Sequence, residues 1–331
     1  MASLKPKASL VVFALMMFGC LLFYFSTSPF EGRLNMSIRK KSHPMTSAYQ
    51  MELVKVLRSA SMPDRTVILT TLNDAWAGSG SVIDLFLESF RIGKDTKKLL
   101  NHLVIVAMDE KAHSRCISIH PHCYFLSTAG VNFTAEKRFM TPDYLKLMWR
   151  RIEFLGKVLE LGYSFDADIM WFRDPFRHLN AADQLVIACD HYTGDANDHN
   201  NRANGGFNYV KANAITLEFY KYWYMARVLY PKSHDQTVFE IIKHDPAVNA
   251  MGLSIKYLDT AYFSGFCEPS KDMNKVSTMH ANCCVGIENK LQDLRLVLDN
   301  WKNFTALSPE DKILKGSSKT SPWSAPDKCK S

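Results

Sequence analysis

The stretch Gly162–Phe176, GYSFDADIMWFRDPF, places two acids directly before an apolar run. Acidic side chains are rarely buried unless they are paired or bind a metal. Asp166 and Asp168, one residue apart, can together supply oxygen ligands to a hard divalent cation. An Asp-x-Asp triplet arises about once by chance in a chain of this length, so the surrounding elements decide its meaning.

Two short β-branched runs, 66–72 and 102–109, predict buried parallel strands. Between them, 81–93 has apolar residues at helical spacing, with Ser81 as a candidate N-cap, so the three segments predict a βαβ unit. The strongest predicted helix, 141–162, ends at Gly162 just before the acids. We therefore predict an α/β fold with a Rossmann-type, mostly parallel sheet flanked by helices.

In an open α/β sheet, ligands bind beyond the carboxyl ends of the strands. Thr70, Thr71 and Asn73 lie at such an end, and Asp109 lies at another. We expect the Asp-Ala-Asp triplet at the same edge. A divalent cation held there would neutralise a diphosphate and act as a Lewis acid on the leaving phosphate.

The N-terminus contains the uncharged run Ser9–Phe25, which is long enough to span a thin bilayer. The alternative is a cleaved signal peptide, but the run is longer than usual and no small-residue cleavage site precedes Pro29. We predict a short cytoplasmic tail, a signal anchor, a stem, a lumenal domain and a loose C-terminal tail, at 1–8, 9–25, 26–63, 64–306 and 307–331.

Composition argues against nucleic-acid binding. The 331 residues carry a net charge of only +7, and no basic stripe with interleaved aromatic residues is present. Three N-x-[ST] sequons follow the predicted anchor, which favours a lumenal body with N-glycosylation at Asn35, Asn132 and Asn303.

Seven of the eight cysteines also follow the predicted anchor. In an oxidising lumen we expect disulfides, with Cys116 and Cys123 close enough in sequence to pair and one cysteine left over. A zinc site around His280, Cys283 and Cys284 is an alternative, but no second ligand pair has suitable spacing.

Eleven sequence blocks between about 66 and 301 resemble, in the same order, the plant nucleotide-diphospho-sugar transferases of glycosyltransferase family 77. The blocks are TLNDAW, LFLESFRIG, LLNHLVIVAMDEKA, HPHCYFL, FMTPDYLKLMWRRIEFL, DADIMWFRDPF, ACDH, NGGFNYVK, HDQTVF, FCEPS and TMHANCC. The resemblance implies a GT-A fold, a UDP-sugar donor, Mn²⁺ or Mg²⁺ as cofactor and retention of anomeric configuration. It also implies a single-pass type II Golgi membrane protein that adds a pentose or hexose to a cell-wall polysaccharide or glycoprotein.

The same resemblance assigns metal ligation to Asp166 and Asp168, with His280 completing the metal shell. A hydrogen-bonded structural histidine is the alternative for His280. Asp235 and Gln236 resemble the catalytic pair that faces the donor sugar, although Asp235 could instead be a helix N-cap.

Further positions are expected to bind the nucleotide sugar. Gly205 and Gly206 allow close backbone approach to a ligand, or else form a turn that enters a strand. Lys146 and Arg150 share one helix face and could reach the diphosphate, or be a solvated face. The residues expected near the base are Thr70, Thr71 and Asn73.

One departure from the family pattern bears on activity. Only three residues separate Gly162 from Asp166, where family members usually carry a few more apolar residues. Three residues span about 10 Å, which is short for a strand that crosses a sheet. Either the preceding helix gives up its last turn or the acids are displaced, and a displacement of about 1 Å can cost ~100-fold in rate.

Three functional hypotheses follow. The first is a retaining glycosyltransferase, which would use either front-face displacement or a covalent intermediate on a carboxylate. The second is an impaired family member that acts as a scaffold or partner, in a homo- or hetero-oligomer with other Golgi transferases. The third is a binding module that recognises a glycan without transferring it.

Overall fold

A computed structural model of the chain describes residues 47–128, 137–167, 169–316 and 322–329, without the side chains of 165–167. The predicted anchor 9–25, the sequons at Asn35 and Asn132, and Asp168 lie outside the described residues. Within those ranges, none of the helices has both the length and the apolar composition needed to cross a bilayer.

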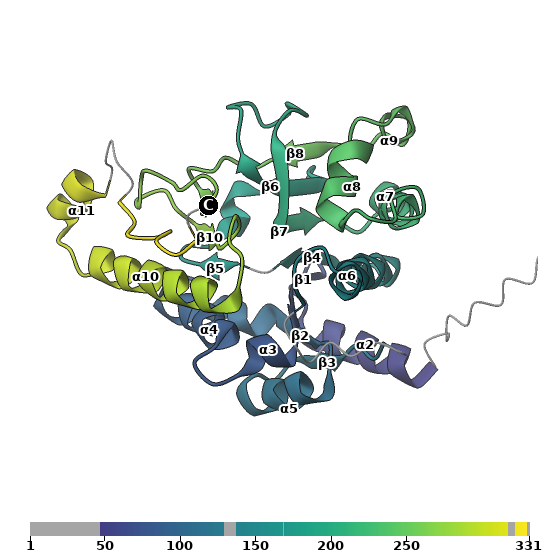
Figure 1. Ribbon diagram of the computed structural model, residues 1–331, viewed down its shortest axis with the longest axis horizontal. Helices are drawn as coiled ribbons and strands as arrows, with labels where there is room; N and C mark the ends of the chain where they lie inside the picture. The colour runs from purple at the N-terminus through teal and green to yellow at the C-terminus, as the bar shows by residue number, and fades with distance from the viewer. Residues whose placement is uncertain (1–46, 129–136, 168, 317–321, 330–331) are drawn as a thin grey trace, which may run out of the picture. The chain divides into compact units, whose positions relative to one another are not determined.

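The main sheet has seven strands in the order β3-β2-β1-β4-β7-β6-β8 (Figure 1). The pairs β1·β2, β2·β3, β1·β4 and β6·β8 are parallel, whereas β7 runs antiparallel to both β4 and β6. This mixed α/β sheet confirms the predicted class and is consistent with a GT-A-like fold. The strands are β1 Thr66–Leu72, β2 Leu103–Ala107, β3 Cys123–Phe125, β4 Ser164–Ala167, β6 Leu185–His191, β7 Arg202–Val210 and β8 Ile255–Tyr257.

The predicted βαβ unit is confirmed, with helix α4 (Val82–Ile92) between β1 and β2. Its apolar face buries residues such as Phe86 and Phe90 in the same core as Ile68 and Ile105 of the sheet. Ser81 occupies the N-cap position, but its side chain makes no capping hydrogen bond. The remaining elements on this half are α3 Asp74–Ala77, the 3-10 helix η1 Lys97–His102 and α5 Glu110–Ile119.

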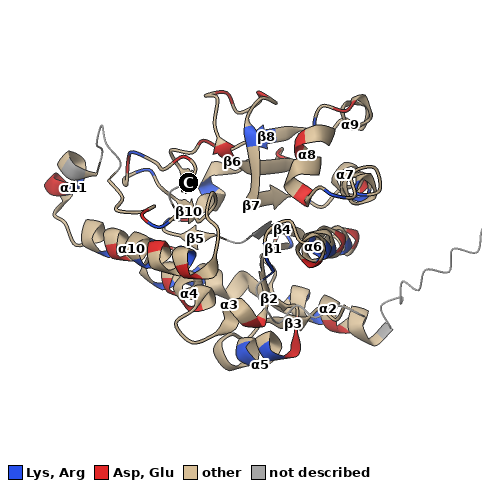
Figure 2. Ribbon diagram, in the orientation of Figure 1, with Lys and Arg blue, Asp and Glu red and all other residues tan. Residues whose placement is uncertain are grey.

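Helices α6 (Pro142–Glu160), α7 (Ala214–Ala226) and α8 (Asp235–Ile242) lie together on one side of the sheet (Figure 1). Thr141 caps α6 by accepting a hydrogen bond from the Tyr144 N–H at 3.4 Å. Basic and acidic residues are interspersed along α6 and α5 (Figure 2), so neither helix forms a purely basic face. The short helix α9 (Pro246–Ala250) follows α8.

A second sheet, β5-β10-β9, comprises Met170–Trp171, Thr278–His280 and Phe263–Gly265. It packs with helix α10 (Ile287–Thr305) around a separate apolar cluster. In that cluster the Trp301 ring stacks on Phe172 with centroids 4.8 Å apart. The 3-10 helix η2 (Pro175–His178) follows β5.

Both ends of the predicted globular domain need correction. Helix α2 (Ser47–Ala60) falls within the predicted stem, yet Leu53 and Leu57 are buried against β2 and β3. The C-terminal segment, expected to be loose, forms α11 (Pro309–Lys315) and then buries Trp323. The buried Asp293 carboxylate accepts hydrogen bonds from three backbone N–H groups of 327–329, so this segment is part of the domain.

The disulfide predicted between Cys116 and Cys123 is confirmed. Two others, Cys267–Cys283 and Cys284–Cys329, use both cysteines of the alternative zinc site, which is therefore wrong. Among the described residues Cys189 is the free cysteine, and it is buried in β6. The Cys284–Cys329 disulfide links the C-terminal segment to the residues just before α10. The two cysteines are 45 residues apart, so no local sequence pattern could have predicted that they pair.

Candidate active site

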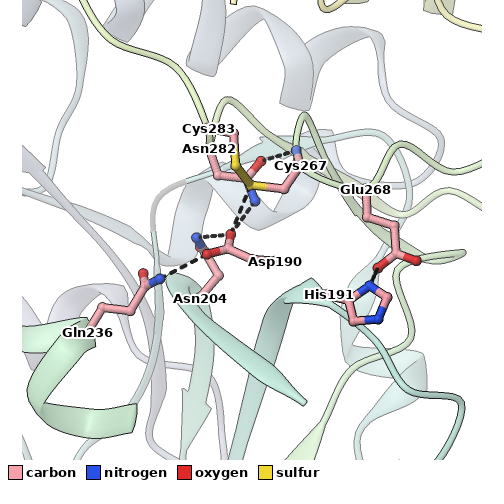
Figure 3. The surroundings of a disulfide bond; sticks show 8 residues. All are labelled: Asp190, His191, Asn204, Gln236, Cys267, Glu268, Asn282 and Cys283. Carbon is pink, nitrogen blue, oxygen red and sulfur yellow. Dashed lines mark hydrogen bonds and ion pairs between the residues drawn. A yellow bond between two sulfur atoms is a disulfide. The ribbon is translucent and has the colours of Figure 1, made fainter. Parts of the chain in front are cut away.

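The carboxylate of Asp190, near the end of β6, is the centre of a polar group that we call the Asp190 group (Figure 3). Its Oδ1 accepts hydrogen bonds from Asn204 Nδ2 and Asn282 Nδ2, both at 2.7 Å, and its Oδ2 accepts one from Gln236 Nε2 at 2.9 Å. A carboxylate has about four acceptor sites, so Oδ2 keeps one for a ligand.

The three amides come from elements far apart in sequence. Asn204 lies on β7, Gln236 in the first turn of α8, and Asn282 just after β10. The pairing of β6 with β7 shifts register at Ala188 and again before His191, and these irregularities occur where Asp190 and Asn204 face each other. Asn204 and Asn282 are buried, so the carboxylate also satisfies amide groups that would be costly to leave unpaired.

The Cys267–Cys283 disulfide supports Asn282 (Figure 3). The Asn282 Oδ1 accepts a hydrogen bond from the Cys267 backbone N–H at 3.2 Å, which orients the amide so that its Nδ2 faces Asp190. The Cys267 Sγ lies 3.3 Å from Asp190 Oδ1. Because this sulfur is in a disulfide and carries no proton, the approach is a packing contact and not a hydrogen bond.

Gly205 and Gly206 adjoin the Asp190 group through hydrogen bonds to Gln236 and Asn204, and their surroundings differ. A Cβ at Gly206 would lie 2.3 Å from the His280 ring, whereas a Cβ at Gly205 would meet nothing within 4 Å. The Gly206 N–H donates to Asn204 Oδ1 at 2.7 Å. The Gly205 N–H donates more weakly to Gln236 Oε1, at 3.4 Å. Gly206 therefore makes room for His280, and Gly205 leaves its side open.

The His280 ring packs against Gly206, and its buried Nδ1 has no hydrogen-bond partner among the residues that the structure describes. Burial, with smaller effects of Lys290 and Arg151, lowers the pKa of His280 to about 3. The neutral imidazole that results is the form that binds a metal. The alternative for His280 was a structural role through a hydrogen bond, and the described residues provide no such bond at Nδ1.

The backbone before the apolar run joins the two sheets. β4 pairs with the first four residues of β1, and Asp166 lies opposite Ile68, four residues before β1 ends at Leu72. At about 3.3 Å per residue this is a difference of ~13 Å in height. Helix α6 ends at Glu160, and Gly162 reverses the chain with φ 76°, so the helix ends at its predicted stop and keeps its last turn.

After the triplet, the chain rises to the small sheet, where Met170 pairs with Met279 and Trp171 with Thr278. Continuing that antiparallel register by one residue brings His280 opposite Ile169, the neighbour of Asp168. In the part of the chain with described side chains, no group of three His, Cys, Asp or Glu residues could hold a metal, and Asp166 and Asp168 lie outside it.

The cation at this site is Arg151, next to one of the predicted pair. Its Nη2 donates to the Gly205 carbonyl at 2.9 Å. Arg150 instead donates to Glu153 at 2.7 Å and to Thr128 and Ser127. Lys146 is exposed and pairs with Asp143 at 3.3 Å. The described partners of Lys146 and Arg150 therefore do not include the Asp190 group. Arg150 is one residue from Arg151, which is a rotation of about 100° around the helix.

Asp235 is the first residue of α8, and the N-cap position before it belongs to His234, so the N-cap alternative is wrong. Its side chain is buried, with Oδ1 3.6 Å from His234 Nδ1. The negative charge of Asp235 contributes, after burial, to raising the pKa of Tyr144 to about 12. Asp235 thus lies one residue from Gln236 in a largely enclosed position.

Thr70, Thr71 and Asn73 lie at the carboxyl end of β1, where Leu72 is level with Ala107 of β2. Thr70 and Asn73 are buried. Asp109, at the end of β2, is used structurally, because it accepts from the Ala112 N–H at 2.9 Å and from the Asp74 N–H at 2.8 Å.

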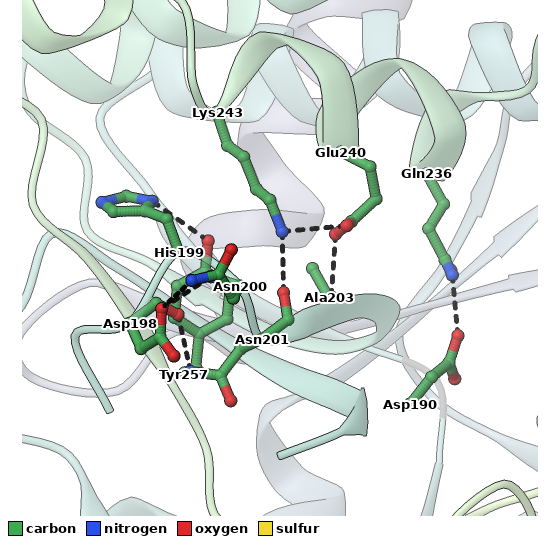
Figure 4. Close-up of polar contacts among 10 residues, drawn as sticks. All are labelled: Asp190, Asp198, His199, Asn200, Asn201, Ala203, Gln236, Glu240, Lys243 and Tyr257. Carbon is green, nitrogen blue, oxygen red and sulfur yellow. Dashed lines mark hydrogen bonds and ion pairs between the residues drawn. The ribbon is translucent and has the colours of Figure 1, made fainter. Parts of the chain in front are cut away.

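An ion pair with a buried lysine supports the strand that carries the two glycines (Figure 4). Lys243 is 2% exposed, and its Nζ donates to Glu240 Oε2 at 2.8 Å and to the Asn201 carbonyl at 2.7 Å. Glu240 Oε1 in turn accepts from the Ala203 N–H at 2.8 Å. The pair thus fixes the start of β7 immediately before Asn204.

Sequence reasoning missed Asp190, Arg151 and Asn282 as site residues. Asp190 did carry a signal, since it is an acid at the end of the apolar run LVIACD. No comparable signal in the sequence points to Asn282 or Arg151. The role of Asn282 depends on the Cys267–Cys283 disulfide, and that of Arg151 depends on how α6 is oriented on the sheet. The third sequon residue, Asn303, is exposed on α10 and remains a predicted glycosylation site.

Comparisons with known proteins agree on one family. A family model described as nucleotide-diphospho-sugar transferase matches residues 98–294, more than half of the chain. Two Arabidopsis thaliana proteins are similar along most of their length. The uncharacterized protein At4g15970 is 52% identical over 279 residues, covering 84% of this chain and 73% of that protein. The uncharacterized protein At1g28695 is 36% identical over 309 residues, covering 91% and 90%.

Proposed function

The chain belongs to the nucleotide-diphospho-sugar transferase family, and we propose that it is a retaining, metal-dependent glycosyltransferase of family 77. Its donor would be a UDP-sugar carrying a pentose or hexose, and its acceptor a hydroxyl of a cell-wall polysaccharide or glycoprotein. The observation that carries this proposal is the Asp190 carboxylate, held by three amides at the carboxyl edge of the sheet. This edge is where α/β sheets bind ligands.

The Asp190 group would bind the donor sugar. Asp190 Oδ2 can accept one hydroxyl, and Gln236 is oriented by its contacts with Asp190 and Gly205. Three amide donors stabilise the carboxylate as an acceptor and reduce its nucleophilicity. We therefore assign Asp190 to binding, which favours front-face displacement over a covalent intermediate on this residue.

Asp166, Asp168 and His280 would hold Mn²⁺ or Mg²⁺. What supports this proposal is the buried Nδ1 of a neutral His280, which has no hydrogen-bond partner among the described residues. When bound, the cation would neutralise charge on the donor diphosphate. Arg151, whose guanidinium contacts the Gly205 carbonyl, would add positive charge on the other side of the two glycines.

We further propose a Golgi protein of type II topology, anchored through 9–25. Three disulfides support an oxidising compartment. The exposed Asn303 is available to a lumenal oligosaccharyltransferase. Protease protection of the chain in sealed Golgi vesicles, with loss of protection after detergent, would support this topology; cleavage in intact vesicles would refute it.

The function is tested by screening the purified protein against UDP-sugars with Mn²⁺. We expect hydrolysis or transfer of one sugar class, lost in Asp168→Ala and reduced at least ~10-fold in Asp190→Asn, because hydrogen bonds to a charged group contribute about 1.5–3 kcal/mol. Asp143→Asn on the exposed start of α6 is the matched control. Turnover that survives Asp168→Ala would contradict the metal role, and NMR detection of the inverted anomer would contradict retention.

The height of Asp166 favours a second candidate, an impaired enzyme that acts as a scaffold or partner of other transferases. Asp166 is level with the middle of β1, not with its end. Lengthening the segment before Asp166 by four apolar residues, which matches the shortfall and keeps the alternation of side chains, should raise turnover if this shortfall limits catalysis. Equal turnover of the two proteins would count against the impaired form.

A further inference from the structure

A pocket of about 350 Å³ is lined by residues of η2, α10 and α11 and of the segments that follow α4 and β5. Four cations line the pocket: Lys94, Arg173, Arg177 and Lys312. The uncharged lining residues are Asn274, Thr305, Trp301 and Phe304. None of its lining residues is acidic. None of these residues belongs to the Asp190 group.

These four cations share one pocket and have no acidic partner in its lining. Among the described residues, none of the four has a carboxylate within 4.0 Å, whereas Arg115, Lys243 and Lys256 each have one. Lys94 and Arg177 have no side-chain hydrogen bond within the described ranges, and Lys312 donates only to the Thr305 carbonyl, at 2.7 Å.

Arg173 is held in place more firmly than the other three. It donates to the Val276 carbonyl, and its guanidinium lies over the Trp301 ring, 4.7 Å from the centroid. Burial first, and then the charge of Arg177, lower the pKa of Arg173 to about 10, while Asp272 opposes the shift. The positive charges of Arg173 and Arg177 are therefore close enough to repel each other, and a bound anion would reduce this repulsion.

We propose that this pocket binds a polyvalent phosphate, of diphosphate or sugar-phosphate size. A volume of about 350 Å³ is at the lower end of the range for small-molecule sites. Guanidinium groups match phosphate oxygens in a fork geometry, and lysines add point charges. Four cations exceed what a single carboxylate would neutralise, so the charge count favours a phosphate over an acidic sugar.

The test is isothermal titration of the full-length protein with pyrophosphate in the presence of saturating UDP, which occupies the proposed donor site. The variant Lys94→Gln/Arg177→Gln removes two exposed cations without disturbing the core, and Lys111→Gln, whose side chain is 73% exposed, removes a cation elsewhere. We expect the pocket variant to weaken pyrophosphate binding at least ~10-fold, and Lys111→Gln to leave it unchanged.

The same titration is repeated with inorganic phosphate and with galacturonate, which is an acidic sugar. Tighter binding of pyrophosphate than of galacturonate, with inorganic phosphate between them, is the expected order. Equal binding of galacturonate, equal loss in Lys111→Gln, or no pyrophosphate binding once UDP is saturating would each overturn the proposal. None of these outcomes depends on whether the protein transfers a sugar, so the pocket and the proposed function fail separately.

Discussion

Replacing Gly206 by alanine tests the geometry of the candidate site most directly. The added Cβ would lie 2.3 Å from both Cε1 and Nδ1 of His280 and 2.8 Å from Asn204 Oδ1. Ordinary carbon contacts are about 3.5–4.0 Å, so the ring must move by about 1 Å or more. A displacement of that size can cost ~100-fold in rate, and overpacking costs about 1–3 kcal/mol of stability.

The neighbouring Gly205→Ala variant is the matched control. Its Cβ would meet nothing within 4 Å, and neither glycine has the positive φ at which alanine is strained. The two backbone contacts of Gly205, with Gln236 and Arg151, do not involve the added methyl group. Removing a glycine where the backbone permits it stabilises a fold by about 0.4–1 kcal/mol.

The assay is UDP affinity and UDP-sugar turnover, with thermal unfolding measured in parallel. We expect Gly206→Ala to lose most of its turnover and to unfold several degrees lower, since 1 kcal/mol shifts Tm by roughly 2–4 °C at this size. The double variant Gly206→Ala/His280→Ala should recover stability without recovering turnover. Wild-type behaviour of Gly206→Ala, or equal damage by Gly205→Ala, would refute the reasoning.

Three other predictions concern groups near the site. Lys243→Met should lower the free energy of unfolding by about 1–3 kcal/mol in urea titrations, because it removes the buried donor to Glu240 and to the Asn201 carbonyl; a loss under about 0.5 kcal/mol would mean that these hydrogen bonds do not stabilise the fold. Burial, with a smaller effect of Asp190, raises the pKa of the Cys189 thiol. In a Cys20→Ser background, N-ethylmaleimide at pH 8 should therefore modify the unfolded protein and spare the native one. Asn282→Ala should weaken UDP-sugar binding roughly 10- to 100-fold by removing one donor to Asp190, and unchanged affinity would place Asp190 outside the donor site.

Local sequence patterns were sufficient to predict features that lie within one element or between residues close in sequence. The β-branched runs and the helical spacing between Thr66 and Asp109 predicted β1, α4 and β2, because an apolar run and an apolar helix face are local properties of the sequence. The Cys116–Cys123 disulfide was predictable because the two residues are close in sequence.

Long-range pairing decided the rest. Whether Arg150 or Arg151 faces the two glycines depends on how α6 rotates onto the sheet, and no spacing rule specifies that rotation. The height of Asp166 against β1 is a register, which local sequence does not determine.

By itself, then, the sequence determined the α/β class, the family and the two aspartates as candidates, because motifs and periodicity are properties of neighbouring residues. Only the tertiary structure decided that Asp190 gathers amides from β7, α8 and the segment after β10, and that a disulfide holds one of them. The physical reason is that a buried carboxylate is stabilised by whichever donors the packed elements bring within about 3 Å of it.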